Sequence, residues 1–215
     1  RITKDPLTPP FDIQFEEPSE HKLTITCWDA LGNEVNDTET FFVDKTPPEI
    51  KKEIDEEKFT CYDWCAAETG EWGEGFRECL VNHCQFNNET EEWFPIWITN
   101  TTPIWASAFD PEPHPSGLNS VSWRVTRVDD KNCWNQELCI AEAQGAEDWN
   151  EVQGNEAHFN ITEESCHLIE IKATDNVNKT STHKQCVFVD NTAPTPNKTV
   201  GKPSDFWTPG ENGDP

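Results

Sequence analysis

Cysteine is the residue type in this chain with the most evident chemistry, because nine are present among 215 residues. Four of them form a Cys-x3-Cys pair followed by a Cys-x4-Cys pair. Such spacings can place each pair on one face of a short helix. Of the three connectivities possible, we predict two nested disulfides, Cys61 with Cys84 and Cys65 with Cys79. A zinc site of four thiolates is the alternative, although such sites favour tighter Cys-x2-Cys spacing.

Motifs for catalysis are otherwise missing from the sequence, which has no Gly-rich phosphate loop, no His-x3-His metal pair and no nucleophile elbow. His83 lies beside Cys79 and Cys84, the one local cluster of histidine and cysteine. A reactive thiol would need such a neighbour, but packing around a disulfide is the simpler interpretation. With 41 acidic residues, neighbouring carboxylates are expected by number alone and do not indicate a glycosidase. We therefore predict that the chain is not an enzyme.

Charge limits the classes of partner. Sixteen Lys and Arg against 41 Asp and Glu give a formal net charge of −25. A surface this acidic repels phosphate backbones, so we predict no binding to nucleic acid. No apolar run approaches 18 residues, so we expect no membrane span and no signal peptide. Because the chain begins with Arg1 and lacks methionine, we expect a mature product or an excerpt of a longer chain.

Glycosylation motifs point to the same compartment as the cysteines. The sequence contains six Asn-x-Ser/Thr sequons, where roughly two or three would arise by chance. Sequons in excess beside many cysteines are typical of an oxidising, extracellular environment. We therefore expect N-linked glycans at Asn36, Asn88, Asn100, Asn160, Asn178 and Asn197.

The elements that carry these residues occur twice. Residues 11–48 align with residues 157–194 at an offset of 146 positions without a gap, which is the signature of a repeat. Asp29 then falls on Asp175, and Asp44 falls on Asp190. Apolar positions also coincide, namely Phe15 with Ile161, Leu23 with Ile169, Ile25 with Ile171 and Phe42 with Phe188.

Alternation of apolar and polar residues predicts short strands in both copies and between them. We expect strands at residues 11–16, 21–29, 40–43, 49–58, 93–99, 104–109, 120–128, 149–152, 158–162, 167–175 and 184–190. Short strands joined by turns predict an all-β fold, an antiparallel β-sandwich. The three strands of the first copy cannot close a core by themselves. Residues 1–47 are therefore the C-terminal half of one repeat, 48–194 a complete repeat with a disulfide-rich insertion at about 59–92, and 195–215 the start of another.

Aspartates recur at the ends of these strands and are candidates for calcium binding. Asp44 and Asp190 precede the prolines between repeats, and Asp29 and Asp175 begin turns. Calcium prefers several hard oxygen ligands and would make a repeat junction rigid. Side-chain capping of the turns is the alternative interpretation, and it requires no metal. No other cofactor is expected.

The repeated motif resembles bacterial and archaeal immunoglobulin-like (Big-type) tandem repeats of cell-surface proteins. The matching residues are Glu16-Glu17, Asp29–Asn33 and Val43–Pro48 in the first copy, and Glu163-Glu164, Asp175–Asn178 and Val189–Pro194 in the second. The second copy has Asn178 where the family's turn has glycine, and asparagine tolerates a positive φ better than most residues. The resemblance implies an immunoglobulin-like sandwich, and it does not extend to the cysteine-rich insertion.

The resemblance also bears on the remaining cysteines. In immunoglobulin sandwiches a disulfide often joins the second strand to the penultimate one. Cys27 lies on the penultimate strand of the first copy, so its partner is expected in the missing half of that repeat, outside this chain segment. Two further pairings are predicted within the second repeat, a local Cys133–Cys139 bond and a Cys166–Cys186 bond, although the register of the latter hairpin looks offset.

These expectations define two functional hypotheses. The first is a structural or adhesive module of a glycosylated, extracellular surface or filament protein, of archaeal type, with neighbouring copies of itself or adjacent repeats as partners. Such modules could join head to tail by strand complementation or as a covalent tandem array. The alternative is a carbohydrate-binding accessory domain of a secreted enzyme, with loop tryptophans as its platform. Candidate platform residues are Trp64, Trp72, Trp134 and Trp149, whose burial against disulfides is the competing interpretation.

Overall fold

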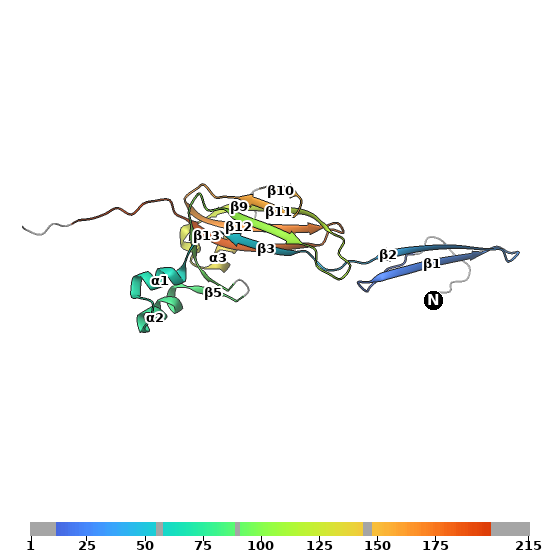
Figure 1. Ribbon diagram of the computed structural model, residues 1–215, viewed down its shortest axis with the longest axis horizontal. Helices are drawn as coiled ribbons and strands as arrows, with labels where there is room; N and C mark the ends of the chain where they lie inside the picture. Colours follow the sequence, from blue (N-terminus) through green and yellow to red (C-terminus); the bar gives the residue numbers. More distant parts are fainter. Residues whose placement is uncertain (1–11, 55–57, 89–90, 144–147, 199–215) are drawn as a thin grey trace, which may run out of the picture.

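The protein is mostly β, since strands make up 45% of the residues that the structure describes, and this part of the chain also has three short α-helices. A computed structural model describes residues 12–54, 58–88, 91–143 and 148–198 (Figure 1). Residues 1–11 of the expected first half-repeat and residues 199–215 of the expected third segment lie outside the described residues. A two-stranded hairpin extends from one end of the larger sheets, and the segment after the last strand leaves from the opposite end (Figure 1).

The hairpin consists of β1 (Glu20–Trp28) and β2 (Glu34–Phe42), which form a sheet of their own. The strand predicted at 11–16 is not present at residues 12–16, because no described strand lies beside this segment to share its backbone hydrogen bonds. Phe15 instead packs on Phe41, with ring centroids 5.8 Å apart.

The largest sheet has six strands in the order β10-β9-β12-β13-β7-β4. Its members are β4 (Phe59–Thr60), β7 (Ile96–Ile98), β9 (Leu118–Val128), β10 (Asn150–Gln153), β12 (Ser165–Asp175) and β13 (Thr180–Val189). The expectation of a purely antiparallel sheet is wrong for one pair, since β7 runs parallel to β13. No tight turn joins these two strands, so no hairpin restraint sets their direction.

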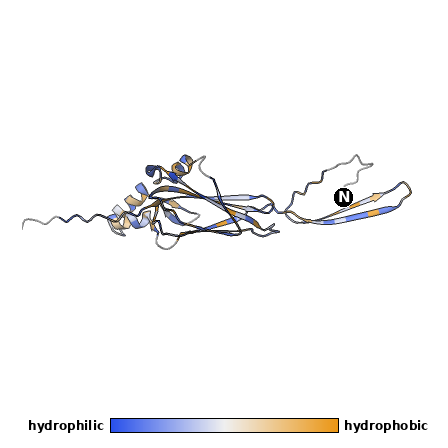
Figure 2. Ribbon diagram, turned by 90° about the horizontal axis from the view of Figure 1, so that it is seen from above, coloured by the Kyte–Doolittle hydropathy of each residue, from blue (hydrophilic) through white to orange (hydrophobic). Residues whose placement is uncertain are grey.

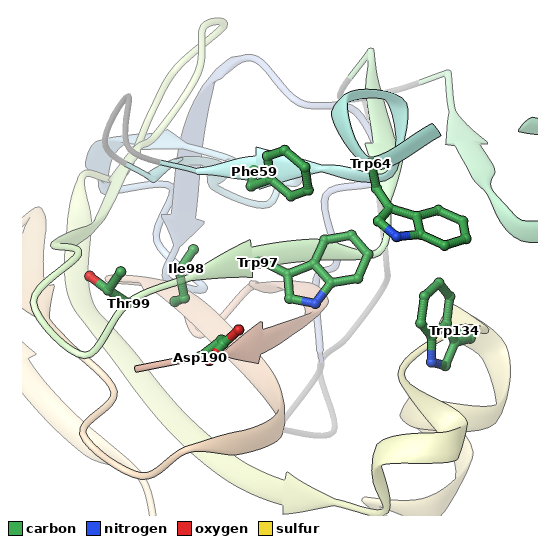
Figure 3. Close-up of a pocket in the computed structure, with 7 residues that line it drawn as sticks. All are labelled: Phe59, Trp64, Trp97, Ile98, Thr99, Trp134 and Asp190. Atoms are coloured by element: carbon green, nitrogen blue, oxygen red, sulfur yellow. The ribbon is translucent and has the colours of Figure 1, made fainter. Parts of the chain in front are cut away.

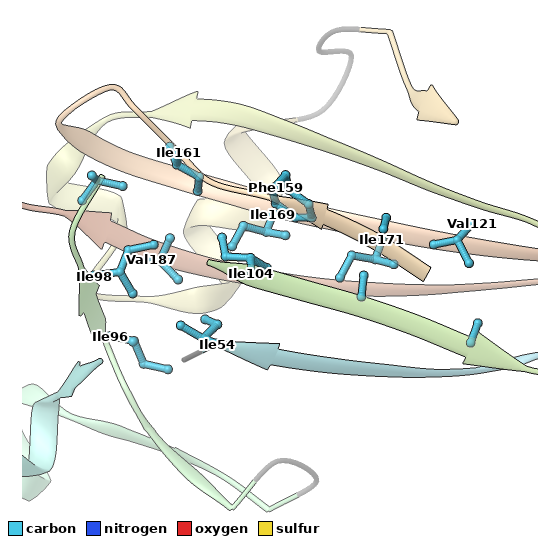
Figure 4. Close-up of a cluster of buried hydrophobic side chains, with 14 of the residues drawn as sticks. Ile54, Ile96, Ile98, Ile104, Val121, Phe159, Ile161, Ile169, Ile171 and Val187 are labelled. Carbon is cyan, nitrogen blue, oxygen red and sulfur yellow. The ribbon is translucent and has the colours of Figure 1, made fainter. Parts of the chain in front are cut away.

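A three-stranded sheet, β11-β8-β3, packs over the larger one. It consists of β3 (Glu49–Ile54), β8 (Ile104–Phe109) and β11 (Glu156–Phe159), all paired antiparallel. Alternate side chains of both sheets point into a single core (Figure 4). The core includes Ile54, Ile104 and Phe159 from the smaller sheet and Val121, Ile169, Ile171 and Val187 from the larger.

The cysteine-rich region contains α1 (Cys61–Thr69), α2 (Glu74–His83) and a small hairpin of β5 (Gln85–Asn87) and β6 (Glu92–Phe94). Thr60 caps the start of helix α1, because its hydroxyl accepts from the backbone of Asp63 while the Asp63 carboxylate accepts from the backbone of Thr60. The two disulfides are nested as expected, Cys61–Cys84 and Cys65–Cys79. Sulfurs bonded in this way are not thiolates, which argues against the zinc alternative.

The two remaining disulfides differ from the expected pairs. The structure joins Cys133 to Cys166 and Cys139 to Cys186, in place of the predicted Cys133–Cys139 and Cys166–Cys186 bonds. In the β12–β13 hairpin, Cys166 lies opposite Phe188, so Cys186 is two residues out of register with it. Cys139 lies on the short helix α3 (Gln136–Glu142), which is thereby bonded to β13, and Cys133, which follows the 3-10 turn η1 (Asp130–Asn132), is bonded to β12.

Candidate functional site

The β1–β2 hairpin, here called the open hairpin, has the same geometry as β12–β13. Glu20 lies opposite Phe42 in the first, and Cys166 lies opposite Phe188 in the second, so the register is identical at the offset of 146. The turns also correspond, because the left-handed position is taken by Gly32 (φ +86°) in one and by Asn178 (φ +63°) in the other. The sequence repeat is therefore a structural repeat.

Side-chain hydrogen bonds in the two turns match as well. Asp29 Oδ1 accepts from the backbone N–H groups two and four residues ahead, at 2.9 Å each. Asp175 Oδ1 accepts from the equivalent groups at 2.9 and 2.7 Å. The turns are thus capped by their first aspartate, as the interpretation without a metal requires.

One face of the open hairpin corresponds to the buried core of the complete unit, and we call it the core face. Ile25 is 39% exposed and Phe41 is 37% exposed, whereas their counterparts Ile171 and Val187 are fully buried. In the complete unit, the sheet β11-β8-β3 covers the corresponding face of β12 and β13, and β9 pairs with the edge of β12 that lies away from β13. Among the described residues, nothing comparable covers the hairpin, which projects as a thin arm (Figure 2). The core face comprises Leu23, Ile25, Cys27, Phe41 and Val43, whose counterparts Ile169, Ile171, Ala173, Val187 and Val189 are all in the core. Ile13 and Phe15 precede the hairpin, and their counterparts are Phe159, in β11 of the covering sheet, and Ile161, which follows it.

Cys27 lies on the core face, opposite Val35, and is exposed. All nine cysteines are within the described residues, and Cys27 is the one without a disulfide partner. Its counterpart Ala173 is completely buried. A layer packed on the open hairpin would therefore contact the Cys27 thiol.

Three aspartates meet where the open hairpin joins the two-layered unit, and we call them the aspartate cluster. Asp44 follows β2, Asp110 follows β8, and Asp175 ends β12. One carboxylate oxygen from each lies within 4.8 Å of the others. Asp44 is 8% exposed and Asp175 is completely buried. Of the four sequence-predicted calcium residues, the structure therefore brings together two, and it adds Asp110, which the sequence analysis missed.

Backbone donors orient each carboxylate of the aspartate cluster. Asp44 accepts from the N–H of Thr46 at 3.0 Å and from that of Ser116 at 2.9 Å. Asp110 Oδ2 accepts from the N–H of Gly117 at 2.7 Å. Burial alone would raise the pKa of Asp44, but these hydrogen bonds and the charge of the nearby Lys179 outweigh it and lower that pKa. Asp44 is therefore an anion at neutral pH.

Asp29 and Asp190 are not part of the aspartate cluster. Asp29 lies at the tip of the open hairpin, and its second oxygen accepts from the Asn33 amide at 2.6 Å. Asp190 lies at the far end of the unit, where its Oδ1 accepts from the N–H of Thr192, as Asp44 Oδ1 does from that of Thr46. Each makes the same local hydrogen bonds as its counterpart. Among the described residues, neither belongs to a cluster of carboxylates.

Aromatic rings line a surface pocket beside the cysteine-rich region (Figure 3). Trp97 stacks on Phe188 at 5.5 Å and meets Trp134 edge-on at the same distance, and Trp134 meets Trp64 at 5.6 Å. Phe59, Ile98, Thr99 and Asp190 complete the lining.

Two of the candidate platform tryptophans lie elsewhere. Trp72 is 86% exposed, in the bend between α1 and α2. Trp149 is half-buried under the side chains of Arg124 and Lys172, which lie 4.5 and 4.7 Å from its ring centre. The predicted platform is thus divided, with Trp64 and Trp134 in the pocket and Trp72 and Trp149 outside it.

The six sequon asparagines all fall within the described residues. Five are exposed, while Asn100 is partly buried beside the fully buried Thr102 of its own sequon. Asn160 lies next to it and donates its amide to the backbone oxygen of Asn100 at 2.7 Å. Thr90 and Thr199, which complete two of the sequons, lie outside the described residues. Glycosylation at these positions stays a prediction.

No protein-family model and no curated protein sequence matches this chain. Four disulfides are typical of proteins that fold in an oxidising compartment. In the described part of the chain, no helix is both long enough and apolar enough to cross a bilayer. Function is therefore inferred from the repeat and from the geometry at its junction.

Proposed function

We propose that this chain is a structural module of a glycosylated, extracellular surface or filament protein, in which the open hairpin is one half of an immunoglobulin-like repeat. The other half comes from a neighbouring repeat, either in the same polypeptide or in another copy. Its proposed role is mechanical, since it would link repeats end to end.

The observation that carries this proposal is the correspondence of the core face with the buried core. Leu23, Ile25, Cys27, Phe41 and Val43 each stand where the complete unit has a core residue, and Asp37 and Glu39 share this face at the positions of His183 and Gln185. A two-stranded hairpin is marginally stable on its own, and it needs a covering layer for independent stability. Exposed apolar residues arranged as half of a known core therefore favour a partner with the structure of the other half.

The position of the open hairpin supports linear assembly. It extends from one end of the two-layered unit, and the segment after β13 leaves from the opposite end (Figure 1). Pro47 and Pro48 restrict the link on one side, and Pro194 restricts the link on the other. Contacts at opposite ends that are not related by a two-fold axis produce filaments when the rotation between units does not close a ring.

Charge and cysteine chemistry also agree with an extracellular array. A net charge of −25 opposes lateral aggregation of the assembled units, since like charges repel at close approach. Two disulfides hold α1 and α2 of the cysteine-rich region together and another holds α3 to β13, which stabilises a domain exposed to an oxidising medium.

Electron microscopy of native material tests the proposal. We expect regular fibres or arrays in which the core face of each open hairpin is covered by strands of an adjacent repeat. A native particle in which the core face remains bare, or contacts an unrelated protein, would contradict the proposal. Mass spectrometry of the same material would show glycan masses on the sequon peptides.

A carbohydrate-binding accessory domain is the second candidate, and the aromatic pocket favours it. Trp64, Trp97 and Trp134 line the pocket together with the polar side chains of Thr99 and Asp190, and aromatic rings beside hydrogen-bonding groups suit a sugar. Glycan-array binding that is lost in Trp134→Ala and retained in Trp72→Ala would favour this function. Trp72 is the control because it is exposed and lies outside the pocket.

A further inference from the structure

The aspartate cluster contains buried carboxylate oxygens that lack partners. Oδ1 of Asp110 and Oδ2 of Asp175 are buried and have no hydrogen-bond partner, and Asp175 is completely inaccessible to solvent. A buried carboxylate oxygen without a partner is unfavourable, and buried charges are normally paired or coordinate a metal. Three carboxylates within 4.8 Å of one another add mutual repulsion. The cluster thus lacks a positive charge at its centre.

Neighbouring cations do not supply this charge. Lys179 is close enough to lower the pKa of Asp44, but its side chain is exposed and no ion pair joins it to the cluster among the described residues. The backbone N–H groups that orient the three carboxylates occupy only one oxygen of Asp110 and one of Asp175. The remaining oxygens are in place for a ligand that accepts electron pairs.

We propose that the aspartate cluster binds one Ca²⁺ ion, with Asp44, Asp110 and Asp175 as its protein ligands. A site made entirely of carboxylate oxygens, with neither histidine nor cysteine, suits a hard cation. Calcium accepts six to eight oxygens in flexible geometry, so water can complete the set at the partly exposed Asp110 side. Magnesium demands a near-ideal octahedron and gives up its own waters reluctantly.

The consequence of calcium binding follows from where the ligands lie. Asp44 belongs to the segment that leaves the open hairpin, whereas Asp110 follows β8 and Asp175 ends β12 at the near end of the two-layered unit. One ion bound to all three therefore fixes the hairpin against the unit. The site goes beyond the proposed function, because it exists within a single chain and does not require assembly.

The experiment measures calcium binding and thermal unfolding of the full chain. Calcium chloride is titrated by calorimetry into protein stripped with EDTA, and a Kd of about 10⁻⁴–10⁻³ M is expected, as in extracellular calcium modules. At 10 mM calcium, the Tm should rise by about 3–10 °C over the value in EDTA. An equal concentration of magnesium chloride should produce a smaller shift.

Two variants and two matched controls locate the site. Asp110→Asn and Asp175→Asn keep an oxygen for the backbone donors but remove a negative charge. Each variant should therefore bind calcium at least tenfold more weakly and lose the calcium-dependent rise in Tm. In EDTA, both should melt at or above the wild-type Tm, because repulsion inside the cluster is relieved. Asp29→Asn and Asp190→Asn alter aspartates in the same local turns outside the cluster, and they should retain the full shift.

Two results would overturn the proposal. One is a wild-type chain whose Tm and heat of titration do not respond to calcium. The other is a calcium shift of equal size in the wild type and in both cluster variants, which would assign the effect to the general acidity of the surface. A magnesium shift as large as the calcium shift would refute the assignment of the ion.

Discussion

Lys52 of β3 and His183 of β13 lie on opposite sheets, and the charge of the lysine adds to burial in lowering the pKa of the imidazole to about 4. Lys52 Nζ and His183 Nε2 are both buried without a hydrogen-bond partner. The negative charge of Glu92 lies near both groups and raises both pKa values, in opposition to burial. This region of the core is therefore sensitive to protonation.

Acidification should destabilise the protein through His183. The pKa of His183 is about 4 in the folded chain and 6.5 when the side chain is unperturbed, so between these values the unfolded state binds the proton more readily. Stability should therefore fall as the pH drops from 6.5 to 4, by up to about 3 kcal/mol from this group. Urea unfolding at pH 7 and pH 4.5 measures the loss, which His183→Gln should reduce.

The control for that measurement is His158→Gln. His158 is exposed on β11, so its variant should retain the pH dependence of the wild type. Equal pH dependence in the wild type and in His183→Gln would contradict the assignment to His183.

Replacing Lys52 by methionine should stabilise the protein at neutral pH. Burial lowers the pKa of Lys52 from 10.5 to about 8, so the unfolded chain binds its proton more tightly and stability should rise between pH 8 and 10.5. At pH 7 the lysine is charged in both states and the full cost is present, so Lys52→Met should add about 2–3 kcal/mol to the free energy of unfolding. Lys51→Met changes the adjacent, exposed lysine of the same strand and should leave stability within about 0.5 kcal/mol.

Charge on the core face should prevent completion of the open hairpin. Burying an isoleucine contributes about 1.5–3 kcal/mol, so Ile25→Asp should weaken association at least about tenfold. Sedimentation velocity of the purified chain, mixed with fragments of the native assembly, measures this association. Thr24→Asp places the same charge one residue away on the other face of β1 and should associate like the wild type. Equal loss in both variants would point to a general charge effect.

Removing the Cys139–Cys186 bond should destabilise the two-layered unit. Because this disulfide closes a loop between residues 47 apart, the double variant Cys139→Ala, Cys186→Ala should lose about 2–4 kcal/mol of stability against urea. Peptide mapping without reduction should recover Cys139 joined to Cys186. Recovery of a Cys133–Cys139 peptide instead would contradict the connectivity. Cys27→Ser, at the unpaired cysteine, is the control.

Local patterns predicted local structure well. The repeat at an offset of 146 anticipated the matching hairpins, and the left-handed φ of Asn178 confirms that asparagine replaces glycine in that turn. Alternation located β8 at its true bounds, and the spacing of the first four cysteines led to the nested disulfides. Each of these features is formed within one short segment of the chain.

Contacts between distant segments could not be predicted. The Cys133–Cys166 and Cys139–Cys186 bonds depend on the segment from η1 to α3 packing against β12 and β13, which no spacing reveals. Asp110 lies in a loop without a counterpart in the first copy, so the repeat gave no reason to group it with Asp44. The predicted strand 93–99 is divided at Pro95, which cannot donate a backbone hydrogen bond.

The position of the disulfides determines how far this chain can be stretched. Under tension applied at its two ends, the 47-residue span between Cys139 and Cys186 and the 23-residue span between Cys61 and Cys84 stay closed even after the sheets separate. At about 3.4 Å per residue, roughly 240 Å of contour length is withheld. A tether built from such units would extend only in short steps under tension. Reduction of the disulfides would make the same tether much longer and more compliant.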